Sequence, residues 1–270
     1  MIRVCFAGVT GWTAPPIVAA IDAADDLMLT SGISRSMAGQ TLAEASASRS
    51  DGFIYPSVSE ALQSAEIDVL VDYTSASAVK ENVWTAVQAG VHVVVGSSGL
   101  TADDYDELDR LARDRLVGVV AAGNFSIMAA ILQRTAALAA EHLDNWEIVD
   151  YASAEKPDVP SGTSRELAEI LEKVRRPRSA IPLSQLSGPI EARGAEVAGT
   201  QVHSVRLPGY VVSTEIIFGG AGERLIMRQD PGSSPDPYVA GTLLAIRKVA
   251  DVPGVRRGLG SLLFDAPTND

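Results

Sequence analysis

The chain has 270 residues, of which 46% are hydrophobic and 21% are charged. That length predicts about two domains, each with a core large enough to fold without disulfide bonds. The 34 acidic and 22 basic residues give a net charge of −12, which disfavours nucleic acid or an anionic membrane as a partner but leaves small anions open.

The cysteine content excludes two further classes of protein. Cys5 is the single cysteine, so an intrachain disulfide and a zinc site built on a Cys pair are both ruled out. No apolar run approaches the roughly 20 residues of a membrane span, and the first residues lack the apolar stretch of a signal peptide. We therefore expect a soluble, cytoplasmic metabolic enzyme.

The first 122 residues alternate short β-branched runs with helical patterns, which predicts repeated βαβ units around a mostly parallel sheet. The expected strands are Ile2–Ala7, Leu27–Ile33, Asp68–Tyr73, Val91–Val95 and Val117–Ala121. This half is predicted to be a Rossmann-like, doubly wound α/β domain.

The pattern changes after Asn124, where we expect a long helix, a strand and a shorter helix. These are Ile127–Leu143, Trp146–Tyr151 and Ser164–Val174. Three runs without intervening helices follow and predict antiparallel strands, before a last helix. The runs are Val202–Leu207, Val211–Phe218 and Arg224–Arg228, and the helix is Tyr238–Ala250.

Two domains follow from this order of elements. Residues 1–123 with 233–270 are predicted to form a dinucleotide-binding domain. Residues 124–232 are predicted to form a second α+β domain, with a mixed or antiparallel sheet, for substrate binding and oligomerisation.

A glycine-rich turn, Gly8–Ala14, follows the first strand and leads into a helix. Glycine at such a turn lets the backbone approach a pyrophosphate, which then meets N–H groups at the helix N-terminus. The alternative is a turn that merely closes a βα connection. Its place after the first strand of a βαβ array favours the dinucleotide site.

The second strand ends without the carboxylate that would bind an adenosine ribose diol. Arg35, with Ser34 and Ser36, could instead hold a 2′-phosphate through charge-assisted hydrogen bonds. The alternative is a solvated arginine in a surface loop. Together with the glycine-rich turn, this segment favours NADPH as cofactor, with NADH as a further possibility.

Small and polar residues stand at three further strand ends, where parallel sheets bind ligands. The segments are 72–74, 96–99 and 123–126. Each leaves backbone groups free for a nicotinamide, although ordinary turn chemistry uses the same residue types.

The segment Lys156–Thr163 runs into the helix that we expect at Ser164–Val174. A helix N-terminus with Ser161, Gly162 and Thr163 is typical of a carboxylate site, and Lys156 adds a charge and a possible proton donor. The structural alternative is a capping box, because Thr163 and Glu166 have its spacing. The combination fits a small dicarboxylate.

These segments together resemble the 4-hydroxy-tetrahydrodipicolinate reductase (dihydrodipicolinate reductase) family over nearly the whole chain, including residues 203–207 and 215–220. The resemblance implies an NAD(P)H-dependent oxidoreductase of lysine and diaminopimelate synthesis, with Lys156 as general acid and Gly162 and Thr163 on a substrate carboxylate. It also implies a homotetramer whose second domains form the interface. The candidate cofactor-binding residues are Gly8, Val9, Thr10, Gly11, Trp12, Thr13, Ser34, Arg35, Thr74, Gly96, Ser97, Ser98, Ala122, Gly123, Asn124 and Phe125.

The chain departs from that family where the family carries two consecutive histidines before the lysine. Ala152 and Ser153 stand there, and neither can replace an imidazole, although Ser153 remains a candidate for substrate binding. Two strand motifs of the second domain also differ, at 213–215 and 228–231. The substrate pocket is therefore predicted to be altered.

The three histidines, His92, His142 and His203, offer no obvious substitute for the missing pair. His92 lies in an apolar strand and His142 late in a helix, so both favour structural roles, while His203 could face either side of its strand. No metal-ligand cluster and no serine-hydrolase motif is present.

We therefore expect an NADPH-dependent reductase that transfers hydride to a cyclic, carboxylated imine or conjugated substrate. A paralogue that reduces a different imine or carbonyl, and a non-catalytic NADP-binding protein, remain the alternatives.

Overall fold

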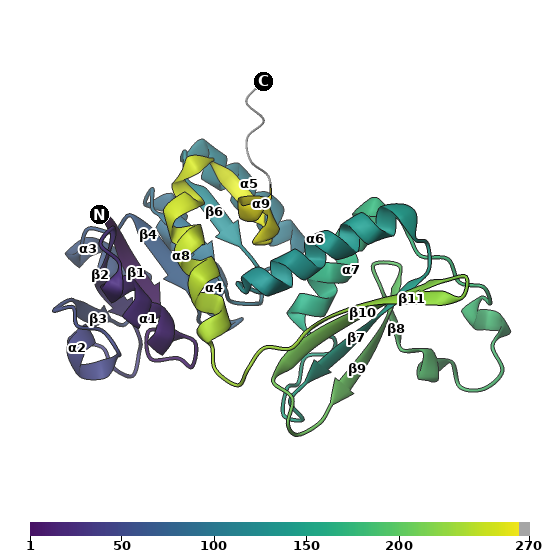
Figure 1. The fold of residues 1–270 in the computed structure, drawn as a ribbon. Helices are drawn as coiled ribbons and strands as arrows, with labels where there is room; N and C mark the ends of the chain where they lie inside the picture. Colours follow the sequence, from purple (N-terminus) through teal and green to yellow (C-terminus); the bar gives the residue numbers. More distant parts are fainter. Residues whose placement is uncertain (265–270) are drawn as a thin grey trace. The chain divides into compact units, whose positions relative to one another are not determined.

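The computed structural model describes residues 1–264 and divides into two compact units. Within the described residues, unit 1 comprises 1–127 with 235–264, and unit 2 comprises Met128–Ser234. Each unit is coloured by sequence in Figure 1.

Unit 1 is built on a seven-stranded sheet in the order β12-β6-β5-β4-β1-β2-β3, and all of its strand pairs are parallel. This order contains the doubly wound 3-2-1-4-5-6 arrangement of dinucleotide-binding folds, which confirms the predicted fold class. The strands are β1 (Ile2–Ala7), β2 (Leu27–Ile33), β3 (Phe53–Tyr55), β4 (Val69–Asp72), β5 (His92–Val95), β6 (Gly118–Ala121) and β12 (Gly254–Arg257).

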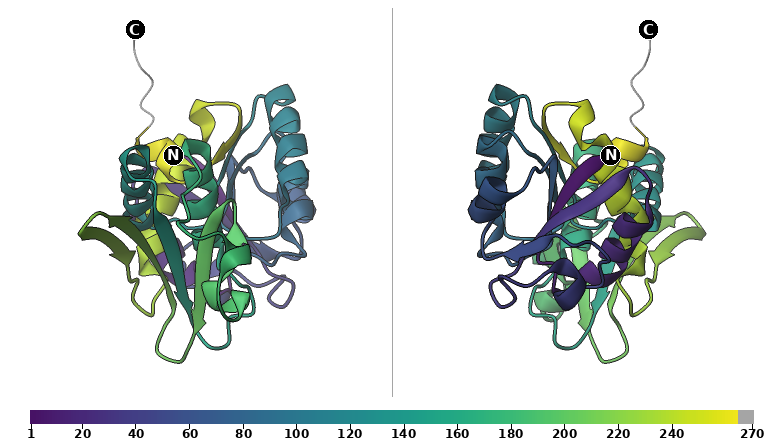
Figure 2. Two further views of the ribbon diagram at one scale, coloured as in Figure 1. Left: turned by 90° about the vertical axis from the view of Figure 1, so that its right-hand side faces the viewer. Right: turned by 90° about the vertical axis from the view of Figure 1, so that its left-hand side faces the viewer.

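Helices cover both faces of this sheet, which explains why its strands are apolar on both sides. Figure 2 shows α3, α4 and α5 on one face and α1 with α8 on the other. The helices of unit 1 are α1 (Ala14–Ala23), α2 (Leu42–Ala45), α3 (Val58–Ser64), α4 (Val79–Gln88), α5 (Ala102–Asp114), α8 (Val239–Lys248) and α9 (Gly260–Leu263).

Unit 2 contains a mixed five-stranded sheet in the order β11-β10-β7-β9-β8. Its strands are β7 (Trp146–Ala152), β8 (Ala195–Val197), β9 (Thr200–Arg206), β10 (Val212–Gly220) and β11 (Glu223–Gln229). Two helices, α6 (Ile127–His142) and α7 (Gly162–Val174), pack together on one face of this sheet around Ile148, Leu167 and Phe218.

One expectation about unit 2 was wrong. β10 and β11 are antiparallel as predicted, but β9 does not pair with β10. β7 lies between these two strands, antiparallel to β10 and parallel to β9. Alternation of apolar residues reports which face of a strand is buried, but it does not report the partner strand.

β7 alternates between buried and partly exposed residues along its whole length. Trp146, Ile148, Asp150 and Ala152 therefore point to the side covered by α6 and α7. Asp150 is the only charged side chain among these four, and it is wholly buried.

In the part of the chain that the structure describes, no helix combines the length and the apolar character needed to cross a bilayer.

Candidate active site

The glycine-rich turn leaves β1 through Gly8, whose φ of +84° is unfavourable for other residues. A Cβ at Gly8 would also lie 2.3 Å from the carbonyl oxygen of Tyr73, which follows β4. β1 is the strand at which the order of the sheet reverses, because β2 and β4 flank it. The turn therefore lies at the edge where such sheets bind ligands.

Internal hydrogen bonds close this turn. The Gly11 N–H donates to the Gly8 carbonyl at 2.8 Å, and the Ala14 N–H donates to the Gly11 carbonyl at 3.1 Å. The next two residues, Pro15 and Pro16, occupy the first turn of α1 and have no N–H. The start of α1 thus offers fewer backbone donors than an ordinary helix N-terminus.

Three backbone N–H groups of the turn, those of Thr10, Trp12 and Thr13, have no hydrogen-bond partner among residues 1–264. They are the donors of this turn that can meet a pyrophosphate. Val9 cannot act in this way, because its N–H donates to the Ile33 carbonyl at 3.4 Å and its side chain is buried. The geometry fits a dinucleotide held mainly by the loop backbone.

The Ser34–Ser36 segment lies beside this turn. Thr10 Oγ1 and Ser34 Oγ are 3.1 Å apart, and Ser34 Oγ is 3.3 Å from Ser36 Oγ. Arg35 is exposed and makes no ion pair within residues 1–264. Its guanidinium is therefore available to an anionic ligand.

Asp72, at the end of β4, organises the next two loops, and the sequence interpretation assigned it no role. Its carboxylate is wholly buried and accepts hydrogen bonds from Thr74 Oγ1 at 2.7 Å and from Ser97 Oγ at 2.6 Å. Asn82 Nδ2 donates to the second oxygen at 2.8 Å. These bonds fix Thr74 and Ser97 beside each other, and the Thr74 N–H donates to Ser97 Oγ at 2.7 Å.

At position 96, after β5, glycine is required because a side chain would clash with a neighbouring ring. A Cβ there would lie 2.2 Å from the Tyr73 ring, which packs between Phe6 and Phe125. The Tyr73 hydroxyl lies 2.7 Å from Thr242 Oγ1 on α8. Tyr73 therefore supports the loops after β1 and β5 at once.

The segment after β6 packs closely against α8, because a Cβ at Gly241 of that helix would lie 2.0 Å from the Phe125 carbonyl oxygen. Asn124 Oδ1 accepts a hydrogen bond from the Ser126 N–H at 2.8 Å, and Phe125 is buried. Ala122 is also buried, whereas Gly123 and the predicted Ser98 are exposed. The candidate residues after β4, β5 and β6 thus lie at the carboxyl ends of adjacent strands.

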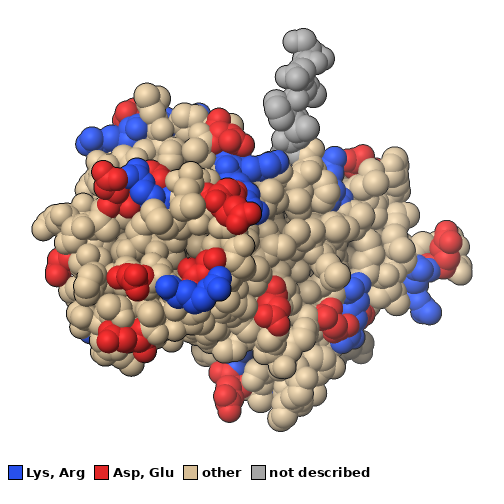
Figure 3. Space-filling model, turned by 60° about the vertical axis from the view of Figure 1, so that its left-hand side comes forward, with Lys and Arg blue, Asp and Glu red and all other residues tan. Residues whose placement is uncertain are grey.

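The face drawn in Figure 3 shows Lys and Arg side chains in small groups beside Asp and Glu. On this face the basic side chains therefore form no large cationic patch.

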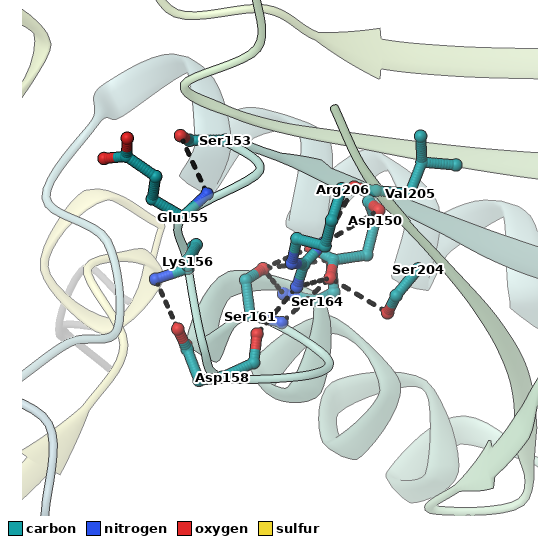
Figure 4. Close-up of polar contacts among 10 residues, drawn as sticks. All are labelled: Asp150, Ser153, Glu155, Lys156, Asp158, Ser161, Ser164, Ser204, Val205 and Arg206. Atoms are coloured by element: carbon teal, nitrogen blue, oxygen red, sulfur yellow. Dashed lines mark hydrogen bonds and ion pairs between the residues drawn. The ribbon is translucent and has the colours of Figure 1, made fainter. Parts of the chain in front are cut away.

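In unit 2, Lys156 lies in the loop between β7 and α7 (Figure 4). Its Nζ is 2.8 Å from Oδ1 of Asp158, and 29% of its side chain is exposed. The Lys156 N–H donates to the Ser153 carbonyl at 3.1 Å, and Ser153 Oγ accepts from the Glu155 N–H at 3.4 Å. Ser153 therefore shapes the turn that carries Lys156.

The helix α7 begins at Gly162, and Ser161 is its N-cap. Ser161 Oγ accepts from the Ser164 N–H at 3.4 Å, so the alternative capping box with Thr163 as N-cap is wrong. Gly162 and Thr163 instead occupy the first turn, where N–H groups and the helix dipole favour an anion. A Cβ at Gly162 would meet nothing within 4 Å, so open space lies beside it.

Asp150 lies directly under that first turn and was not predicted as a site residue (Figure 4). Burial raises its pKa, but hydrogen bonds from Ser161 and Arg206 outweigh burial and hold the pKa of Asp150 below its usual value. Sequence alone gave one signal, a carboxylate at a buried position of an alternating strand.

No histidine replaces the missing pair beside Asp150. His203 lies on the other face of the sheet, where its Nε2 is 2.7 Å from Glu147 Oε2. His92 Nδ1 accepts from the Gly118 N–H at 2.9 Å, and burial lowers the pKa of His92. His142 is exposed at the end of α6.

Ala152, at the first of the two family histidine positions, is wholly buried, and Arg206 is its partner across the strands. Ser213, on β10, is also buried. A histidine at Ala152 would need additional space at a position that has no exposed surface.

Comparisons with known proteins support membership of the dihydrodipicolinate reductase family. The profile of "Dihydrodipicolinate reductase, N-terminus" matches residues 2–125, and that of "Dihydrodipicolinate reductase, C-terminus" matches residues 125–262. The 4-hydroxy-tetrahydrodipicolinate reductases of Moorella thermoacetica and Geobacillus kaustophilus are 36% and 33% identical to this chain, with 97% of it covered in both cases and 98% and 99% of their own lengths.

Among solved structures, a dipicolinate-bound dihydrodipicolinate reductase from Paenisporosarcina sp. TG-14 superposes with a TM-score of 0.79 and 27% identity, covering 97% of this chain and 99% of its own. An amine dehydrogenase from Mycobacterium smegmatis, at 16% identity, TM-score 0.64 and 94% coverage of both chains, shares the fold. The matches over both halves, together with the glycine-rich turn and the Lys156–Thr163 loop, show that the chain belongs to the dihydrodipicolinate reductase family.

Proposed function

We propose that this protein is an NADPH-dependent reductase that transfers hydride to a small cyclic imine or conjugated substrate bearing a carboxylate. The observation that carries the proposal is the first turn of α7, where Gly162 and Thr163 follow a loop that holds Lys156. The family name of the relatives points to 4-hydroxy-tetrahydrodipicolinate as the first substrate to test.

The residues of unit 1 would hold the cofactor. The free N–H groups of Thr10, Trp12 and Thr13 suit a pyrophosphate, and Arg35 suits a 2′-phosphate. When bound, the nicotinamide supplies the hydride. Asp72 fixes the side chains of Thr74 and Ser97 at the strand ends where the nicotinamide ring is expected.

The residues of unit 2 would bind the substrate and supply a proton. The first turn of α7 would accept a carboxylate, which orients the substrate. The Lys156 ammonium would then donate a proton as the imine or enamine is reduced. Ser161 holds the start of the helix, and Ser153 holds the turn that presents Lys156.

A second candidate is a paralogue that reduces a different imine or carbonyl compound. It is favoured by Ala152, which is buried where the family carries an imidazole. Ser153 follows Ala152 in the chain, and Ser213 on β10 is next to the residue that pairs with it, so both favour the same candidate. These small residues change the shape and polarity of the pocket together. A non-catalytic NADP-binding protein is disfavoured, because such a protein would need neither Lys156 nor the start of α7.

A steady-state assay with freshly generated dihydrodipicolinate and NADPH separates these cases. An efficiency within the ordinary range of about 10⁴–10⁸ M⁻¹s⁻¹ supports the lysine-pathway activity. Near silence on this substrate, with NADPH oxidation by another cyclic imine, supports the paralogue. No oxidation with any carboxylated cyclic imine would refute the reductase.

We further infer that the protein is a homotetramer assembled through unit 2. The sheet face opposite α6 and α7 carries Tyr151, Ile217 and Ile226, of which Ile226 is 54% exposed. Light scattering of wild type and Ile226→Glu tests this, because a charge at the interface should shift the mass towards a smaller species.

A further inference from the structure

The carboxylate of Asp150 is held beneath the first turn of α7 by donors from the start of that helix and from β9 (Figure 4). Its Oδ1 accepts from Ser161 Oγ at 2.5 Å and from Ser164 Oγ at 3.1 Å. Its Oδ2 accepts from the Ser161 N–H at 3.0 Å and from Ser204 Oγ at 3.1 Å. Asp150 therefore occupies the helix end that would also attract the carboxylate of a substrate.

Arg206 is the cation that contacts this carboxylate. Its Nη2 lies 2.7 Å from Asp150 Oδ2 and 2.7 Å from the carbonyl oxygen of Asp158, and 14% of its side chain is exposed. Arg206 thus connects the buried carboxylate to the loop that carries Lys156. It comes from β9, where register places it beside Ala152 on the side of the sheet that α7 covers.

Two carboxylates at one helix N-terminus repel each other. A fixed charge at Asp150, which is wholly buried, would lower the affinity of the neighbouring site for any anion. Neutralising Asp150 removes this repulsion and leaves the helix dipole at the start of α7 to the ligand.

We infer that Arg206 is a positioning residue that sets the net charge at the start of α7, so that this helix end can accept a dicarboxylate. The inference rests on the proposed function and deepens it, because it names the residue pair that makes the site selective for doubly charged substrates. Arg206 acts through Asp150 and the α7 turn and needs no contact with the substrate.

Binding measurements can distinguish two roles for the Asp150–Arg206 pair, one in holding the fold and one in setting the charge beneath the site. If the pair only held the fold, Arg206→Gln and Asp150→Asn would each weaken binding of every carboxylate by a similar factor. If charge is decisive, the two substitutions have opposite effects. Arg206→Gln leaves a negative charge under the site, whereas Asp150→Asn leaves a positive one.

The experiment is calorimetry on full-length, NADPH-saturated protein with pyridine-2,6-dicarboxylate and pyridine-2-carboxylate as probes. Wild type, Arg206→Gln, Arg206→Lys, Asp150→Asn and the Arg206→Gln/Asp150→Asn double variant are compared. Thermal unfolding and NADPH affinity of each variant report whether the fold is intact.

We expect Arg206→Gln to bind the dianion at least about tenfold more weakly and to lose more affinity for the dianion than for the monoanion. Asp150→Asn should bind the dianion at least as tightly as wild type, with a higher preference for it. The double variant should recover most of the lost affinity, and Arg206→Lys should stay within about fivefold of wild type because it keeps the charge.

Equal losses for both probes in the two single variants would overturn the inference and leave the proposed function standing. If Arg206→Gln fails to fold, Asp150→Asn still decides, because a lowered dianion preference in this isosteric variant contradicts the charge account. A wild-type protein that binds neither probe would overturn both the inference and the carboxylate site on which the proposed function rests.

Discussion

The Nζ atom of Lys156 lies 2.8 Å from Oδ1 of Asp158, two positions further along the same loop. Asp158 is held in turn by Arg206, which donates to its carbonyl oxygen at 2.7 Å. The ammonium group is therefore oriented by a carboxylate whose backbone is fixed, while part of the Lys156 side chain remains open to solvent. A proton donor needs both of these properties.

Replacing Lys156 tests its role in proton transfer. Lys156→Met should bind NADPH normally but turn over at least about 100-fold more slowly, as expected for loss of a general acid. Lys173→Met, at an exposed position of α7, is the matched control and should keep wild-type turnover. Steady-state kinetics with a reducible cyclic imine measure both, and near-normal turnover in Lys156→Met would assign the proton to another group.

Removing the guanidinium of Arg35 tests the cofactor preference. Arg35→Ala should lose about 1.5–3 kcal/mol of NADPH binding, the usual contribution of a hydrogen bond to a charged group, with little change for NADH. Arg115→Ala, also exposed and without an ion pair within the described chain, is the control. Calorimetry with both cofactors decides, and equal losses for NADPH and NADH would remove the assignment.

The hydroxyl of Thr163 can be tested separately from the helix that carries it. Thr163→Val should raise the apparent KM more than it lowers kcat, if its contact is equally strong in the ground and transition states. Thr163→Ser keeps the hydroxyl and should remain close to wild type. A fall in kcat at unchanged KM would instead place this contact in the transition state.

Gly8 and Gly39 form a matched pair, because both have a φ near +85° but only Gly8 is sterically closed. Gly39→Ala should cost about 1–2 kcal/mol for the left-handed backbone alone. Gly8→Ala should cost more, because its Cβ would meet the Tyr73 carbonyl, and it should also weaken NADPH binding. Thermal unfolding and cofactor titration measure the two effects, and similar losses in both variants would contradict the steric argument.

The start of α5 predicts a pH dependence of stability. Hydrogen bonds from Lys80 and Thr101 lower the pKa of Asp104 to about 2, so this carboxyl releases its proton more readily in the folded state. Its contribution is complete above the unfolded value of about 3.9 and is lost as the pH falls towards 2. The free energy of unfolding lost in Asp104→Asn should therefore shrink across that range.

Asp103→Asn, at the neighbouring exposed position of the same turn, is the control for this measurement. Denaturant unfolding at several pH values between 2 and 7 gives the comparison. A loss in Asp104→Asn that stays constant over the whole range would show that the charge of Asp104 does not matter.

Much of the fold could be predicted, because the buried strands of a parallel sheet are nearly continuous apolar runs that can be recognised in the sequence. β1 and β2 begin and end where the sequence predicts. β3 and β8 were missed because three residues are too few to show a period, and β12 because it carries two arginines. The position of β9 beside β7 depends on pairing between distant segments, which no local pattern contains.

The candidate site was predicted less completely. Lys156 and the start of α7 could be identified because chemically distinctive residues follow one another in the chain. The pair of Asp150 and Arg206 could not, because 56 positions separate the two residues and only the parallel pairing of β7 with β9 brings them together. The choice of Ser161 over Thr163 as N-cap depends on where the helix starts, because both residue types can serve as N-caps.

The strand β12 belongs to the sheet of unit 1 but follows unit 2 in the chain, so it is synthesised after unit 2. This strand pairs with β6, and α8 packs so closely on the preceding segment that a Cβ at Gly241 would lie 2.0 Å from the Phe125 carbonyl. A ribosome therefore releases all of unit 2 before it releases the strand that covers the edge of β6. Until then the backbone of β6 is exposed on one side, where another nascent chain can pair with it. The last strand of unit 1 thus closes this edge to other chains once it has been released, in addition to completing the sheet.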